Sequence, residues 1–87
     1  MYKIVISPHF SKELKRFINN NPEIKSKVIK SLTELISDPD HPSLRNHKLN
    51  STQEWSISVD LNTRIIFKIS ESNIYLESIG NHDNVYI

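Results

Sequence analysis

The spacing of hydrophobic residues changes once along the chain, and this change constrains the fold more than any other feature. Between residues 10 and 36, apolar side chains recur every three or four positions, which is the period of amphipathic helices. Between residues 55 and 79, apolar and polar side chains alternate, which is the period of strands with one buried face. With a short β-rich run at residues 2–6, the order is β-α-α-β-β-β, which predicts an α+β domain.

Two helices are expected in the first half of the chain. Ser7 and Pro8 have the form of an N-cap followed by proline at the first helical position. Residues 19–22 break the pattern, a second helix starts near Pro22, and residues 38–42 stop it. Because the connection is short, we expect an antiparallel helical hairpin. The apolar stripe of the second helix consists of Ile24, Val28, Ile29, Leu32, Leu35 and Ile36.

The second half is expected to form a β-meander of strands near residues 55–59, 64–69 and 74–79. Trp55 and Phe67 fall on the core face, whereas Arg64 and Lys68 point to the opposite face. The prediction is a helical hairpin packed on one face of a mostly antiparallel four-stranded sheet, with the other face open as a working surface. Gly80, the only glycine, follows the last strand, where a backbone angle that other residues avoid is expected.

The size and composition exclude several classes of protein. Eighty-seven residues provide one core, so residues 1–87 are interpreted as a single domain. The chain has no cysteine, which rules out disulfides and thiolate metal sites. No apolar run approaches the roughly 18–20 residues that a membrane span needs. The first residues resemble a strand rather than a signal peptide, so a cytoplasmic location is expected.

The net charge of +1 hides an asymmetry between the two halves. Residues 1–48 carry nine Lys/Arg and five Asp/Glu, whereas residues 49–87 carry two and five. The basic half is the one expected to be helical. This distribution suits contact with a polyanion or an acidic partner protein, although an ordinary solvated helix surface would look the same.

Two histidines and an arginine are the strongest candidates for catalysis. His47 precedes the expected meander, Arg64 begins one of its strands, and His82 follows the last. If the sheet brings them together, one imidazole can accept the proton of a ribose 2′-hydroxyl and the other can protonate the leaving 5′-oxygen. The guanidinium can stabilise charge on the phosphate. These residues would cut RNA without a metal or other cofactor.

Each candidate also has a simpler interpretation. His47 and His82 could be ordinary surface residues, and His9 and His41 compete for the same role. His41 and His47 with Asp38 or Asp40 could bind a metal, but no compact ligand motif is present. Lys48 and Lys68 could bind phosphate or simply be solvated. Tyr86 could anchor the C-terminal tail or stack on an RNA base.

Several segments in order resemble the RelE/ParE superfamily of bacterial toxins, and the YafQ-like and YoeB-like mRNA interferases in particular. The resemblance covers nearly the whole chain. Residues 10–17 resemble the family's first helix, and Ile79 to Tyr86 resemble its "G-x-H-x-x-x-F/Y" ending. The segments between them that match are residues 47–49, residues 55–57 and residues 64–67.

The resemblance implies a microbial-ribonuclease-like fold and a toxin of a type II toxin–antitoxin pair. It implies cleavage of mRNA in the ribosomal A site, with His47 and His82 as acid/base residues and Arg64 on the phosphate. Lys48, Lys68 and Tyr86 would then bind RNA. The implied partners are an acidic antitoxin in a hetero-oligomer, mRNA and the ribosome. A ParE-like toxin that binds gyrase without cutting RNA, and a catalytically degenerate toxin, are the alternatives.

Overall fold

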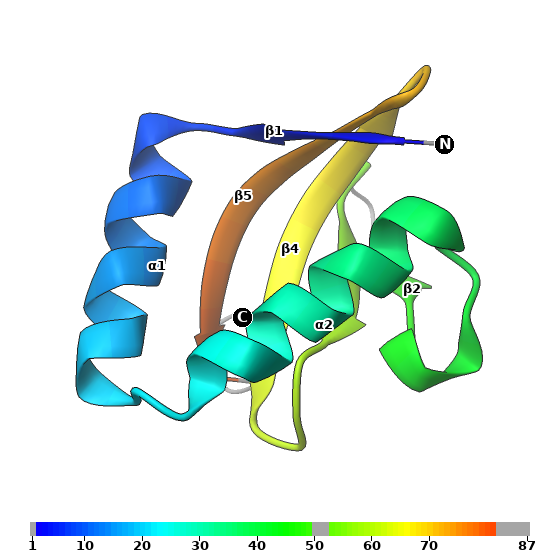
Figure 1. Cartoon of the computed structure of the whole chain (residues 1–87). Helices are drawn as coiled ribbons and strands as arrows, with labels where there is room; N and C mark the ends of the chain where they lie inside the picture. The colour runs from blue at the N-terminus through cyan, green and yellow to red at the C-terminus, as the bar shows by residue number, and fades with distance from the viewer. Residues whose placement is uncertain (1, 50–52, 82–87) are drawn as a thin grey trace.

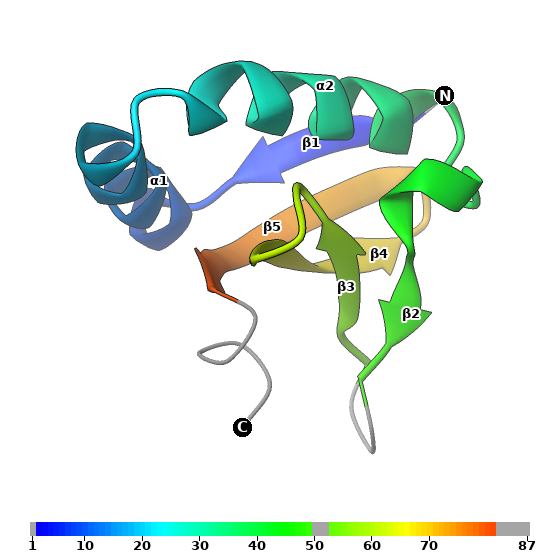
Figure 2. The same cartoon turned by 90° about the horizontal axis from the view of Figure 1, so that it is seen from below.

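The chain folds as two helices over one face of a single sheet (Figures 1 and 2). This computed structural model describes residues 2–49 and 53–81. The α+β class expected from the sequence is confirmed. In chain order the elements are β1 (Lys3–Ile6), α1 (Pro8–Asn20), α2 (Ile24–Ser37), the 3₁₀ helix η1 (Pro42–Leu44), β2 (His47–Lys48), β3 (Trp55–Ser58), β4 (Thr63–Ser70) and β5 (Asn73–Asn81).

Within the described residues, the sheet contains five strands in the order β1-β5-β4-β3-β2, where four had been expected. β1 runs parallel to β5, and the other neighbours are antiparallel. The additional strand is β2, which pairs His47 with Ser56 and Lys48 with Trp55. Two residues are too few to produce a visible alternation, so the pattern could not predict this strand.

The predicted start of the first helix is confirmed. Pro8 begins α1, and the Ser7 side chain accepts a hydrogen bond from the Phe10 amide at 3.1 Å. The two helices do not form the expected antiparallel hairpin, because their axes are oblique to each other. α1 lies beside β5, whereas α2 crosses the sheet (Figure 1). Among the described residues, no helix is long and apolar enough to cross a membrane.

The hydrophobic core lies between the helices and the sheet. Phe10, Leu35, Ile57 and Phe67 are all completely buried in it, and Trp55 packs against it as expected. One residue of the predicted stripe on α2 was assigned wrongly, since Ile29 is 56% exposed. The buried line of α2 has a spacing of three or four residues and consists of Ile24, Val28, Ser31 and Leu35. Ile29 lies about 100° around the helix from Val28.

Candidate active site

His47 and Arg64 lie in contact on the sheet face that points away from the helices. The register sets His47 opposite Ser56 and Arg64 opposite Ser58. Ser56 and Ser58 are two positions apart in β3, so their side chains share a face. Nη2 of Arg64 is 3.3 Å from Nδ1 of His47. The structure therefore brings together two of the three residues that the sequence proposed, while their catalytic roles stay predictions.

The Arg64 guanidinium is held by protein acceptors. Nε donates to the Ser56 hydroxyl at 2.8 Å, and Nη2 donates to the carbonyls of Ser56 at 2.8 Å and Arg45 at 2.9 Å. Such charge-assisted bonds fix the plane of the group. The side chain is only 5% exposed, so the expectation of an open working face is wrong at this position. Arg64 lies on that face, but Arg45 and His47 pack against it.

His47 is exposed, and its contacts favour one tautomer. Nδ1 lies 3.3 Å from the Arg45 carbonyl as well as from Arg64 Nη2. The two hydrogens of Nη2 already have shorter bonds to two carbonyls. The hydrogen-bond pattern is then best satisfied when Nδ1 of His47 carries a proton and donates it to the Arg45 carbonyl. Nε2 becomes the basic nitrogen, as a general base requires.

The other predicted site residues are Lys48, Lys68, His82 and Tyr86, and the structure describes only the two lysines. Strand alternation directs Lys48 to the face opposite His47. Lys68 shares the face of Arg64, but its Nζ lies 3.4 Å from the Glu77 carboxylate. Their roles in RNA binding stay predictions. His82 and Tyr86 lie outside the described residues.

Gly80 borders the site for a reason other than the expected one. It lies inside β5, opposite Arg64, and has no positive φ angle. The expectation of an unusual backbone angle is therefore wrong, because the strand continues to Asn81. A glycine within a strand commonly marks a close approach of other groups. Gly80 therefore places a residue without a side chain opposite Arg64 on the neighbouring strand.

Two carboxylates on the same face were missed by the sequence analysis. A bulge between Ile66 and Phe67 in the register of β4 and β5 inserts Glu77 as an extra residue. The Glu77 side chain hydrogen-bonds the Glu54 carboxyl, which together with burial and the charge of Glu77 raises the pKa of Glu54, while Lys68 opposes the shift. Oε1 of Glu77 is buried and has no hydrogen-bond partner among the described residues. Glu54 therefore keeps its proton to a higher pH than an ordinary glutamate does.

His9 and His41 do not join His47 and Arg64. His9 is 3.8 Å from Glu13, one turn along α1, and lines a shallow pocket of about 470 Å³ that also contains Glu54, Tyr75 and Glu77. His41 caps η1. Within residues 2–49 and 53–81, no group of three or more His, Asp or Glu residues could hold a metal ion. On the described part of the sheet, the candidates for acid/base catalysis are His47 and the Glu54–Glu77 pair.

Comparison with solved structures identifies the same fold in known toxins. YafQ from Escherichia coli superposes with a TM-score of 0.81 at 21% identity, and all of both chains is covered. The toxin–antitoxin complex YoeB–YefM from Staphylococcus aureus contains a chain with a TM-score of 0.75 at 20% identity, covering 94% of this chain and 98% of that one. This chain has the fold of the YafQ and YoeB toxins.

The sequence resembles the same group of proteins. The RelE4 protein of Methanocaldococcus jannaschii, which is named as a toxin, is 25% identical over 88 residues, covering 99% of this chain and 92% of RelE4. No protein-family model matches the chain. The resemblance to RelE-type toxins therefore extends along the full length, as the ordered motifs suggested.

Proposed function

We propose that this protein is the toxin of a type II toxin–antitoxin pair and a metal-free endoribonuclease that cleaves mRNA in the ribosomal A site. The observation that carries the proposal is the contact between His47 and Arg64 on a sheet of the YafQ and YoeB fold. An exposed imidazole beside a fixed positive charge suits the attack of a hydroxyl on a phosphate diester.

In the proposed reaction, His47 Nε2 accepts the proton of a ribose 2′-hydroxyl, and the 2′-oxygen attacks the adjacent phosphorus. The bond from phosphorus to the 5′-oxygen breaks, and His82 gives that oxygen a proton. The products are a 2′,3′-cyclic phosphate and a free 5′-hydroxyl. Arg64 supplies positive charge beside the phosphate and holds the His47 ring. Lys48, Lys68 and Tyr86 are proposed to bind the RNA.

The proposed partner is an acidic antitoxin that forms a hetero-oligomer with the toxin in the cytoplasm. YafQ has been crystallised with DinJ, and YoeB with YefM. The two helices of this chain present Lys12, Lys15, Arg16, Lys25, Lys27 and Lys30, all exposed. A surface of this charge attracts an acidic segment. In this proposal, residues 1–87 form one domain that both cleaves RNA and binds the antitoxin.

The burial of Arg64 supports an alternative in which this arginine stabilises the fold and does not contact RNA. The described hydrogen bonds of its Nε and Nη2 atoms all go to protein acceptors, as expected of a structural arginine. In that case the chain would be a ParE-like toxin that binds gyrase, or a degenerate toxin held in an antitoxin complex.

The proposal is tested in a translating extract with a defined mRNA, with cuts mapped by primer extension. The parent protein is expected to cut, and expression of the chain without a partner is expected to arrest growth. His47→Ala and His82→Ala should each lower the cleavage rate by about 10²–10⁴-fold. His9→Ala is the matched control and should cleave at the parent rate. Gyrase inhibition without any mRNA cuts would favour the ParE-like alternative.

A further inference from the structure

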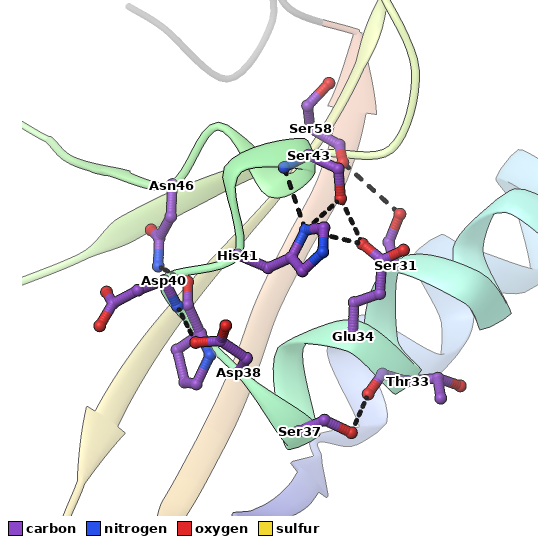
Figure 3. Close-up of polar contacts among 11 residues, drawn as sticks. Ser31, Thr33, Glu34, Ser37, Asp38, Asp40, His41, Ser43, Asn46 and Ser58 are labelled. Atoms are coloured by element: carbon purple, nitrogen blue, oxygen red, sulfur yellow. Dashed lines mark hydrogen bonds and ion pairs between the residues drawn. The ribbon is translucent and has the colours of Figure 1, made fainter.

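Three side chains tie η1 to α2. Ser43 donates its hydroxyl hydrogen to Glu34 Oε2 over 2.5 Å, and the Ser43 amide donates to His41 Nδ1 over 3.1 Å. The Ser43 hydroxyl is also 2.8 Å from His41 Nδ1, and His41 Nδ1 is 3.9 Å from Glu34 Oε2 (Figure 3). We call Glu34, His41 and Ser43 the η1 clamp. They come from the last turns of α2 and from the start of η1.

The η1 clamp has the residue types of a hydrolase triad but not its hydrogen bonding. In a nucleophilic triad the imidazole accepts the serine hydroxyl proton, and the carboxylate binds the other ring nitrogen. Here the hydroxyl proton goes to Glu34, and the same His41 nitrogen that faces the hydroxyl accepts the Ser43 amide. Among the described contacts, no imidazole accepts the Ser43 hydroxyl proton, so the cluster is not a nucleophilic triad. The arrangement instead satisfies the first amide group of η1, that of Ser43, as a capping group does.

The η1 clamp lies two residues from the contacts that fix the candidate active site. Leu44 follows Ser43 and is completely buried in the core. Arg45 comes next with φ 48° and ψ 47°, in the left-handed region that a residue with a side chain avoids. Its carbonyl accepts from Arg64 Nη2 at 2.9 Å and lies 3.3 Å from His47 Nδ1. The direction of this carbonyl therefore depends on how η1 is held.

We propose that Glu34, acting through Ser43 and His41, is a positioning residue for the His47–Arg64 pair. The carboxylate anchors η1 to α2, η1 holds Arg45 in its left-handed conformation, and the Arg45 carbonyl then orients both the guanidinium and the imidazole. The catalytic consequence of this inference rests on the proposed ribonuclease function, but its structural consequence does not. A side chain on a helix behind the sheet would in this way set the geometry of a site on the opposite face.

Two matched pairs of variants test the inference. Glu34→Ala removes the acceptor of the Ser43 hydroxyl, whereas Glu34→Gln keeps an oxygen that can accept it. Ser43→Ala and Ser43→Thr form an equivalent pair on an exposed residue, which protects the test if Glu34→Ala folds poorly. Thr33→Ala is the control on α2, because its hydroxyl bonds only the Ile29 carbonyl of its own helix among the described contacts.

The first measurement needs no RNA. In NMR spectra of the free protein, the Arg64 Nε–H signal and the His47 ring nitrogen signals should shift or broaden in Glu34→Ala and Ser43→Ala. They should stay at the parent positions in Glu34→Gln, Ser43→Thr and Thr33→Ala. Unchanged signals in both alanine variants would overturn the inference, even if the parent protein cleaves RNA.

The second measurement is kinetic and follows mRNA cleavage. Misplacement of the two groups should lower kcat by about tenfold to a hundredfold in the alanine variants with KM little changed, and the conservative variants should restore it. If Glu34→Ala and Glu34→Gln lose kcat equally, and the loss follows the fall in their melting temperatures, Glu34 is only structural and the inference is overturned. If the parent does not cleave at all, the proposed function fails, and the NMR signals alone decide the positioning role.

Discussion

Arg64 and His47 are 17 positions apart in the chain, and their side chains meet at 3.3 Å while sharing the Arg45 carbonyl as a neighbour. This relationship gives Arg64 two tasks. Its three short hydrogen bonds hold Ser56 and the turn before β2, and its charge lies beside the imidazole proposed as the general base. Stability and catalysis should therefore be lost together when it is replaced.

We predict that Arg64→Ala lowers the free energy of unfolding by about 2–4 kcal/mol, because it removes the donor of the hydrogen bonds to the carbonyls of Ser56 and Arg45. Arg64→Lys keeps the charge but cannot reproduce the fork of bonds, so it should be destabilised to a smaller extent. Urea denaturation measures both. Arg16→Ala, on the exposed side of α1, is the control and should stay within about 0.5 kcal/mol of the parent. Parent-like stability of Arg64→Ala would show that these bonds contribute little.

The Glu54–Glu77 pair predicts a pH dependence of stability. Because the pKa of Glu54 is raised above its ordinary value of 4.5, the folded state binds a proton more tightly than the unfolded state. Stability should then fall as the pH rises from about 4.5 through the raised value, and the loss should be complete above it. Glu54→Gln removes this titration, so its melting temperature relative to the parent should rise with pH.

Thermal melts of Glu54→Gln and the parent between pH 4 and pH 8 measure this difference. Glu71→Gln in the exposed turn after β4 is a control that removes a carboxylate without touching the pair. A constant difference between Glu54→Gln and the parent across the whole range would contradict the raised pKa of Glu54.

We predict that antitoxin binding weakens with salt. Residues 1–30 carry seven Lys/Arg and two Asp/Glu, and the basic side chains on the helices are exposed. Calorimetric titration of a candidate acidic antitoxin into this protein, at two salt concentrations, should give a clearly larger dissociation constant at high salt. Lys12→Glu with Lys15→Glu should weaken binding further. The same affinity at both salt concentrations would exclude an electrostatic contact of this kind.

Much of the fold could be predicted because its signals are local. Ser7 and Pro8 start α1 through a cap that is visible in the sequence, and the alternation around Trp55 and Phe67 identifies the core face of the sheet. Ile29 was misassigned because the sequence pattern cannot distinguish an apolar residue at the edge of the buried stripe from one within it. β2 was missed because its two residues acquire strand geometry only from pairing with β3.

The candidate site was only partly predictable, because its contacts are made across elements. The sequence proposed His47 and Arg64 together but not the burial of Arg64, which depends on the Arg45 carbonyl. Glu54 and Glu77 meet because of a bulge that no residue type signals. His41 was interpreted as a competitor for the catalytic role, whereas its role as a cap becomes visible only with η1 in place.

The chemistry of the cut ends tests the central claim most directly. The toxin is treated with a chelator, dialysed, and added to a translating extract with a defined mRNA, and the ends at each mapped cut are analysed. The account predicts cleavage at the untreated rate, a 2′,3′-cyclic phosphate on the upstream fragment and a 5′-hydroxyl on the downstream fragment. A single 2′-deoxynucleotide at the cut site should abolish cleavage there. Fragments with a 3′-hydroxyl and a 5′-phosphate, or cuts that persist at the 2′-deoxynucleotide, would contradict it.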